Sequence, residues 1–215
     1  MGNLHGAVVG TTTIRCVGAI LAGGSGHRLG GTAKGLLDVG GVRMIDRVLT
    51  ALRESCHEVL MVANHPEAAT WNPALRVVPD ARAGLGAAGG IHAALLAAAG
   101  ADVVLVAWDL PFVTATLVQA LRARADEGDA VVCEKAASRW GVEPLCACYR
   151  AACLPALERR LDNGDVRAGA WLADVRLATV TRAALAEIGD PDMLLMDVDT
   201  EADLAAARRY AGDVA

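Results

Sequence analysis

The first feature of this chain that could do chemistry is a glycine-rich segment that ends in a lysine. Residues 21–35 read LAGGSGHRLGGTAKG and include Arg28 and Lys34. Glycines let backbone amides approach phosphate oxygens, because no Cβ blocks the way. The two cations would neutralise a bound triphosphate. The segment therefore predicts a phosphate-binding loop, with a glycine-rich loop of no function as the alternative.

Two common phosphate-binding motifs do not fit this segment. The Walker loop requires Ser or Thr directly after its lysine, and here Gly35 follows Lys34. The dinucleotide fingerprint G-x-G-x-x-G would need its third glycine where Leu29 stands. If the segment binds phosphate, it therefore does so by neither of these two motifs.

Asp109 is a second candidate, because it follows an apolar segment typical of a central strand. That segment, Asp102–Ala107, is a run of Val, Leu and Ala without polar alternation. A carboxylate at its end loses hydration unless it binds a cation. The position favours a metal ligand, and the alternative is a carboxylate near the start of a helix capped by Thr114.

The elements that must position these residues alternate between strands and helices. Strands are expected at Val17–Ala22, Glu58–Ala63, Leu75–Val78, Asp102–Ala107, Asp129–Cys133, Leu145–Tyr149, Val175–Val180 and Leu194–Val198. Helices are expected at Met44–Ser55, at Gly90–Ala99, from Thr114 to about Glu127, at Ala151–Leu161 and from Thr200 to about Tyr210. The alternation predicts an α/β fold, a single-domain Rossmann-like three-layer sandwich with a mostly parallel sheet. Ligands of such sheets bind at the carboxyl ends of the strands.

Composition and charge exclude several classes of protein. The 215 residues fit one domain, which we expect at residues 17–211 after an N-terminal extension at 1–16. A net charge of −5 and an aromatic content of 3% argue against nucleic acid as a partner. The apolar runs are too short for a membrane span, and the first residues do not form a secretory signal. The six cysteines are therefore expected to be reduced thiols in a cytoplasmic protein.

Several segments together resemble one family of enzymes. The L-A-G-G…R-L-G…K pattern of residues 21–34 resembles the loop of nucleotidyltransferases, and more narrowly of the molybdenum cofactor guanylyltransferase family. Further similar segments follow in the order that the family has. They are Val77–Asp80 with Gly84–Ile91, Trp108–Phe112, Glu143–Tyr149, Leu161–Arg167 and Asp197–Leu204. The resemblance runs from about Val17 to Tyr210 and implies the fold of the nucleotide-diphospho-sugar transferases.

The resemblance also implies a reaction and its residues. The family transfers GMP from GTP to molybdopterin, releases pyrophosphate and uses Mg²⁺. The implied catalytic residues are Lys34, Arg28 and Asp109. The implied nucleotide-binding residues are Leu21, Ala22, Gly23, Gly24, Lys34, Asp80 and Asp109. The implied acceptor-binding residues are Arg167, Asp197 and Asp199, and the implied metal ligands are Asp109 and Asp199. Transient contact with the chaperones of molybdoenzymes is a further expectation.

The chain departs from the family pattern at a few positions. Ala33 stands where an aspartate is usual, and Asp197 and Asp199 stand in place of two asparagines. Glu143 and Val166 replace a frequent His and Arg. These departures leave two alternatives open. One is a cytidylyl- or sugar-nucleotide-type nucleotidyltransferase with another phosphate acceptor, and the other is an inactive GTP-binding module.

Overall fold

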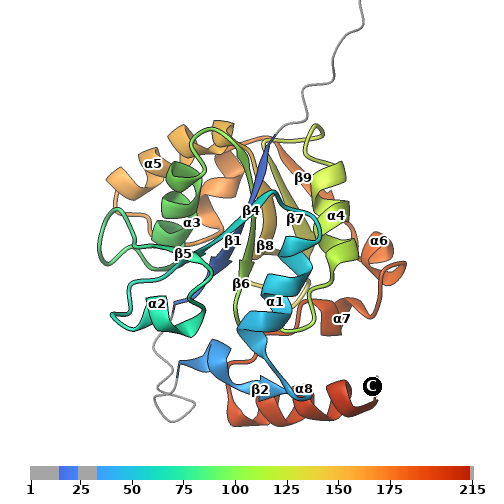
Figure 1. Cartoon of the computed structure of the whole chain (residues 1–215). Coiled ribbons are helices and arrows are strands. Elements are labelled where there is room, and N and C mark those ends of the chain that lie inside the picture. Colours follow the sequence, from blue (N-terminus) through green and yellow to red (C-terminus); the bar gives the residue numbers. More distant parts are fainter. Residues whose placement is uncertain (1–14, 24–32, 214–215) are drawn as a thin grey trace, which may run out of the picture.

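The computed structural model describes residues 15–23 and 33–213 and centres on one seven-stranded sheet (Figure 1). The strand order is β5-β4-β1-β6-β8-β7-β9. The strands are β1 (Cys16–Leu21), β4 (Glu58–Val62), β5 (Arg76–Val78), β6 (Asp102–Ala107), β7 (Ala130–Glu134), β8 (Val142–Tyr149) and β9 (Leu177–Val180). All neighbours pair in parallel except β8, which is antiparallel to both β6 and β7. The predicted mostly parallel α/β fold is confirmed.

Helices cover both faces of the sheet and bury two apolar cores (Figure 1). One core joins the sheet to α1 (Met44–Arg53), α4 (Ala115–Ala123) and α6 (Arg182–Ala186). The other joins it to α3 (Gly86–Ala97) and α5 (Leu154–Asp162). This arrangement is the predicted three-layer sandwich, since each helix buries its apolar side on one face.

A third, smaller core lies beyond the carboxyl ends of the strands. It joins a hairpin of β2 (Asp38–Val39) and β3 (Val42–Arg43) to the last helix, α8 (Glu201–Asp213). Gly40 and Gly41 form the two-residue turn of the hairpin with φ of +64° and +81°. Such turns need positive φ at both central residues, a conformation that glycine adopts without strain. This hairpin was not predicted from the sequence.

The remaining elements are short. They are α2 (Ala68–Trp71), α7 (Pro191–Leu194) and the 3-10 helices η2 (Lys34–Leu36), η3 (Ala151–Cys153) and η4 (Ala170–Asp174). The six cysteines are free thiols, as predicted, and five of them are buried. Within the described residues, no helix combines the length and apolarity needed to cross a membrane. The predicted boundary between residues 16 and 17 stays a prediction, since β1 begins at Cys16 and residues 1–14 lie outside the described part.

Three predicted elements need correction. The predicted strand at Leu194–Val198 is wrong, because Asp190 caps the short helix α7 there and Val198 packs into the third core. The helix after Thr114 ends at Ala123 rather than near Glu127. The alanine-rich helix begins at Gly86, four residues earlier than expected. That earlier start brings its first turn to the ends of the strands.

Candidate active site

The carboxyl ends of β1, β4, β5 and β6 surround a cavity of about 340 Å³. Residues 21–23 line it from β1, while Asp80 and Asp109 line it after β5 and β6. Its size lies within the usual range of small-molecule sites, and its place is where open α/β sheets bind ligands. The structure thus brings together Leu21, Ala22, Gly23, Asp80 and Asp109, as the sequence predicted.

Lys34 is the first residue of η2 and lies between two carboxylates. Its Nζ atom contacts the carboxylate of Asp109 and lies 2.6 Å from Oδ1 of Asp199. The side chains of Lys34 and Asp109 are only 12% and 16% exposed, whereas that of Asp199 is 55% exposed. The predicted catalytic lysine and both predicted metal ligands therefore form one cluster.

Burial and charge act against each other in this cluster. Burial lowers the pKa of Lys34, but Asp109 and Asp199 outweigh it, so the pKa lies above its usual value. Burial raises the pKa of Asp109, and Lys34 offsets that increase only in part. A nearby cation therefore stabilises the ionised form of Asp109, and such a site suits either an ammonium or a divalent metal.

The segment that carries Asp199 is fixed beside Asp109 by the backbone. The amide of Val198 donates to the carbonyl oxygen of Asp109 at 3.0 Å, and the Val198 side chain is buried. Directly after it, Thr200 and Asp203 form a reciprocal cap of α8, with hydrogen bonds of 2.8 and 3.2 Å. The predicted helix cap at Thr200 is thereby confirmed, and it holds Asp199 at the site.

Asp80 and Asn64 form a second polar pair on the cavity wall. The Nδ2 atom of Asn64 donates to Oδ2 of Asp80 at 2.8 Å, and the Asp80 amide donates to Oδ1 of Asn64 at the same distance. The first turn of α3 faces the cavity through Gly86 and Ala87. A helix N-terminus has unpaired amides and a positive dipole end, which attract anions. This wall therefore combines a carboxylate with a helix end whose dipole attracts anions.

Lys135 is a residue that the sequence analysis missed. It follows β7, and its Nζ lies 2.7 Å from Oε2 of Glu143 and 2.5 Å from Oδ2 of Asp197. The pKa of Lys135 is raised, because the two carboxylates outweigh the lowering effect of burial. Asp197 is thus tied to Lys135 and not to the Lys34 cluster. The sequence signal that could have found Lys135 is its rarity, since the chain has only one other lysine.

Other predicted site residues lie apart from this cluster or outside the described residues. Gly24 and Arg28 belong to the latter group. Arg167 does not line the cavity; its guanidinium makes two hydrogen bonds of 2.7 Å to Asp165 and lies 5.8 Å from the centre of the Trp140 ring. Its predicted contact with an acceptor is a proposal that the geometry leaves open.

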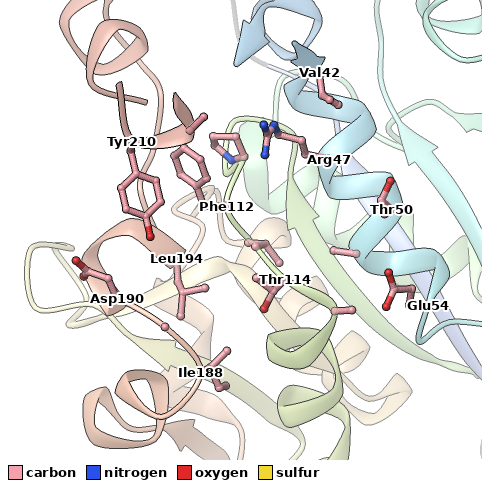
Figure 2. A pocket seen from close by; sticks show the side chains of 16 residues that line it. Val42, Arg47, Thr50, Glu54, Phe112, Thr114, Ile188, Asp190, Leu194 and Tyr210 are labelled. Atoms are coloured by element: carbon pink, nitrogen blue, oxygen red, sulfur yellow. The ribbon is translucent and has the colours of Figure 1, made fainter. Parts of the chain in front are cut away.

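A second cavity, of about 560 Å³, lies between α1 and the C-terminal elements. Figure 2 shows Arg47 and Thr50 on one side of it and Leu194 and Tyr210 on the other. The ring of Phe112 packs edge-on against Tyr210, with 4.9 Å between the ring centres. None of the predicted site residues within the described part lines this cavity, so it is separate from the candidate active site.

The fold and the cluster define a nucleotidyltransferase-type protein. The model of the MobA-like NTP transferase domain family matches residues 18–180. The chain belongs to this family, which confirms the resemblance drawn from the sequence motifs.

Relatives agree with that assignment, and a solved structure shares the fold. The chain is 35% identical to a probable molybdenum cofactor guanylyltransferase of Pelotomaculum thermopropionicum, over 92% of this chain and 94% of the relative. It is 34% identical to a molybdenum cofactor guanylyltransferase of Desulfosudis oleivorans, over 88% and 93%. A molybdopterin-guanine dinucleotide biosynthesis protein A from Archaeoglobus fulgidus has the same fold, with a TM-score of 0.77, 24% identity and coverage of 92% and 99%.

Proposed function

We propose that this protein transfers GMP from GTP to molybdopterin and releases pyrophosphate, which forms molybdopterin guanine dinucleotide. The observation that carries the proposal is Lys34 held between Asp109 and Asp199 at the carboxyl ends of the strands. The named relatives, at 34–35% identity over most of the chain, support the choice of GTP and molybdopterin.

The reaction forms one P–O bond and breaks another. A phosphate oxygen of molybdopterin attacks the α-phosphorus of GTP, and the bond to the β-phosphate breaks, so that pyrophosphate leaves with the electron pair. The attacking phosphate is already ionised at neutral pH, so no strong general base is required. Catalysis then depends on positioning and on neutralising charge.

The chain's own groups divide this work between them. Asp80 and the N-terminal turn of α3 face the cavity that would hold the nucleotide. Lys34 would bind the β- and γ-phosphates and then the leaving pyrophosphate. Arg28 and the loop amides of residues 21–26 have the same role in this proposal, although residues 24–32 lie outside the described part.

Asp109 and Asp199 fit a magnesium ion that arrives with the nucleotide. Their carboxylates converge on one cation, Lys34, and the burial of Asp109 favours a cation beside its carboxylate. The described residues contain no group of three His, Cys, Asp or Glu side chains that could hold a metal. Magnesium commonly binds through one or two carboxylates together with substrate phosphates. When bound, the ion would neutralise phosphate charge, and Asp109 and Asp199 would hold it.

The test is a transfer assay with four nucleotides. The protein is incubated with molybdopterin, Mg²⁺ and α-³²P-labelled GTP, CTP, UTP or ATP, and the labelled dinucleotide and pyrophosphate are measured. Of the four nucleotides, we expect only GTP to give labelled dinucleotide, and we expect its formation to depend on magnesium. Product with CTP instead would support the cytidylyl alternative, and nucleotide binding without any product would support the inactive module. The cytoplasmic location and the contact with chaperones stay predictions.

A further inference from the structure

We propose that Lys135 binds the phosphate monoester of the acceptor substrate and thereby completes a second, acceptor-binding half of the active site. The inference rests on the proposed function, since it assigns a residue to the acceptor of that reaction. It is carried by a direct observation, the Lys135 ammonium between Glu143 and Asp197 on the far side of Asp109 from the nucleotide cavity.

The sheet order separates the two halves of the site. Asp80 follows β5, and the cavity extends across β4 and β1 to Asp109, which follows β6, with Leu145 of β8 at its border. The next strands in the sheet are β8 and β7, which carry Glu143 and lead into Lys135. Because β8 runs antiparallel, its first residues lie at the same edge as the carboxyl ends of β6 and β7. Asp109 thus stands between the nucleotide half and the Lys135 half.

One short segment connects both lysines to Asp109. The amide of Val198 is hydrogen-bonded to the Asp109 carbonyl, while Asp197 pairs with Lys135 and Asp199 pairs with Lys34. Asp197 and Asp199, two positions apart in one segment, therefore each hold one of the two ammonium groups. A reaction that joins a nucleotide phosphate to an acceptor phosphate needs a cation on each side of the reacting atoms.

The use of lysine in this chain sets these two positions apart. Of 20 basic residues, only Lys34 and Lys135 are lysines, and the other 18 are arginines. Among the described residues, arginine supplies the cation of every other ion pair except that of His92 with Glu158. An ion pair that only stabilised the fold could use arginine here too. A compact ammonium with three rotatable donors suits a phosphate oxygen that must fit beside two carboxylates.

The hydrogen bonds around Lys135 leave it a donor for a ligand. Glu143 uses one oxygen for Lys135 and the other for the Leu145 amide, at 2.7 and 3.0 Å. Lys135 donates one N–H to Glu143 and one to Asp197, and an ammonium group has three N–H donors. Within the described residues, the third has no hydrogen-bond partner. The Asp197 carboxylate is 43% exposed, so the cluster opens to solvent on that side.

Charge explains why an anionic acceptor would need Lys135. Asp109, Glu143, Asp197 and Asp199 are four acidic groups, and among the described residues Lys34 and Lys135 are the two cations in contact with them. A phosphate monoester that approached Asp197 would be repelled if Lys135 were absent. Lys135 therefore offsets Asp197, while Lys34 pairs with Asp199.

The test compares the kinetics of Lys135→Met and Lys135→Arg with those of the wild type. For Lys135→Met we expect KM for molybdopterin to rise about 10- to 100-fold, the loss typical of one charge-assisted hydrogen bond, while KM for GTP stays within about twofold. Lys135→Arg should restore part of the loss. A lysine with only a structural role would lower the thermal unfolding midpoint and leave KM for molybdopterin unchanged, and that result would overturn the inference.

A second measurement keeps the inference testable if Lys135→Met does not fold. Wild-type protein labelled with ¹³C at lysine Cε should give two signals, because the chain has two lysines, and Lys135→Arg identifies one of them. Inorganic phosphate, a stand-in for the acceptor phosphate, should shift the Lys135 signal in protein that carries GTP and Mg²⁺. A Lys135 signal that phosphate does not shift contradicts the inference. Absence of any GMP transfer by the wild type would instead refute the proposed function, and the phosphate titration would still decide on Lys135.

Discussion

The indole of Trp108 occupies the space that a Cβ atom on Gly35 would need. A Cβ built at Gly35 would collide with the Trp108 ring, which is itself buried and packs against Trp71 with 5.1 Å between ring centres. Gly35 follows Lys34 and Trp108 precedes Asp109, so this contact joins the two backbone segments that carry the central ion pair. The packing of a glycine on a tryptophan thus positions the proposed catalytic lysine.

Substitution Gly35→Ala should therefore reduce activity by moving Lys34 away from Asp109. The added methyl group has no room, and overpacking of this kind costs about 1–3 kcal/mol of stability. We expect a lower unfolding midpoint and a fall in kcat. Gly212→Ala, where a Cβ meets nothing within 4 Å, is the matched control and should leave kcat unchanged. A Gly35→Ala enzyme with wild-type kcat would show that the contact does not position Lys34.

Lys34→Ala tests the phosphate-binding role directly. The variant should fold, because Asp109 can take up a proton when its cation is lost, and its raised pKa already favours that form. Turnover should fall by about 100-fold or more, by analogy with the loss of one transition-state donor. Single-turnover kinetics with GTP and Mg²⁺ provide the measurement. Arg53→Ala, which removes an exposed cation from the end of α1, should have wild-type turnover.

The local parts of the site could be predicted from the sequence. The glycine loop follows β1, and Asp109 follows β6, because apolar strands and the residues directly after them are adjacent in the chain. The pairing of Lys135 with Asp197 could not be read in this way, since 62 residues separate them and only the folded topology brings them together.

Two fold features escaped prediction for different physical reasons. The apolar residues of 194–198 favour a strand, but the amide of Val198 donates a hydrogen bond to the carbonyl oxygen of Asp109 rather than to a neighbouring strand. The antiparallel direction of β8 could have been predicted from the short connection before it. Only seven residues separate Glu134 at the end of β7 from Val142 at the start of β8. A parallel crossover usually needs a dozen or more residues.

The variants Asp109→Asn and Asp199→Asn should distinguish the roles of the two proposed metal ligands. Asp109 is 16% exposed and has Lys34 as its partner, so loss of its charge should reduce turnover by about 100-fold or more. Asp199 is 55% exposed, and an exposed ion pair contributes at most about 1 kcal/mol. Asp199→Asn should therefore fold as the wild type does and keep turnover within about tenfold, but require more Mg²⁺ for half-maximal rate. Magnesium titrations of both variants measure this difference. Equal losses of turnover in the two variants would show that Asp109 and Asp199 do not have unequal roles.

The Asp165–Arg167 pair predicts how stability changes in acid. The guanidinium of Arg167 donates two hydrogen bonds to Asp165 and holds its pKa at about 2, below the usual 3.8. A carboxyl group whose pKa is lower in the folded state stabilises the protein above the unfolded value, near 3.8, and this contribution is lost as the pH falls toward 2. Thermal unfolding midpoints of the wild type and of Asp165→Asn should therefore differ at pH 5 and converge by about pH 2. The difference should be small and shrink with added salt, because the Arg167 side chain is 51% exposed to solvent. A difference that stayed constant from pH 5 to pH 2 would mean that the carboxylate charge of Asp165 contributes nothing to folding, and that Arg167 is not held by this pair.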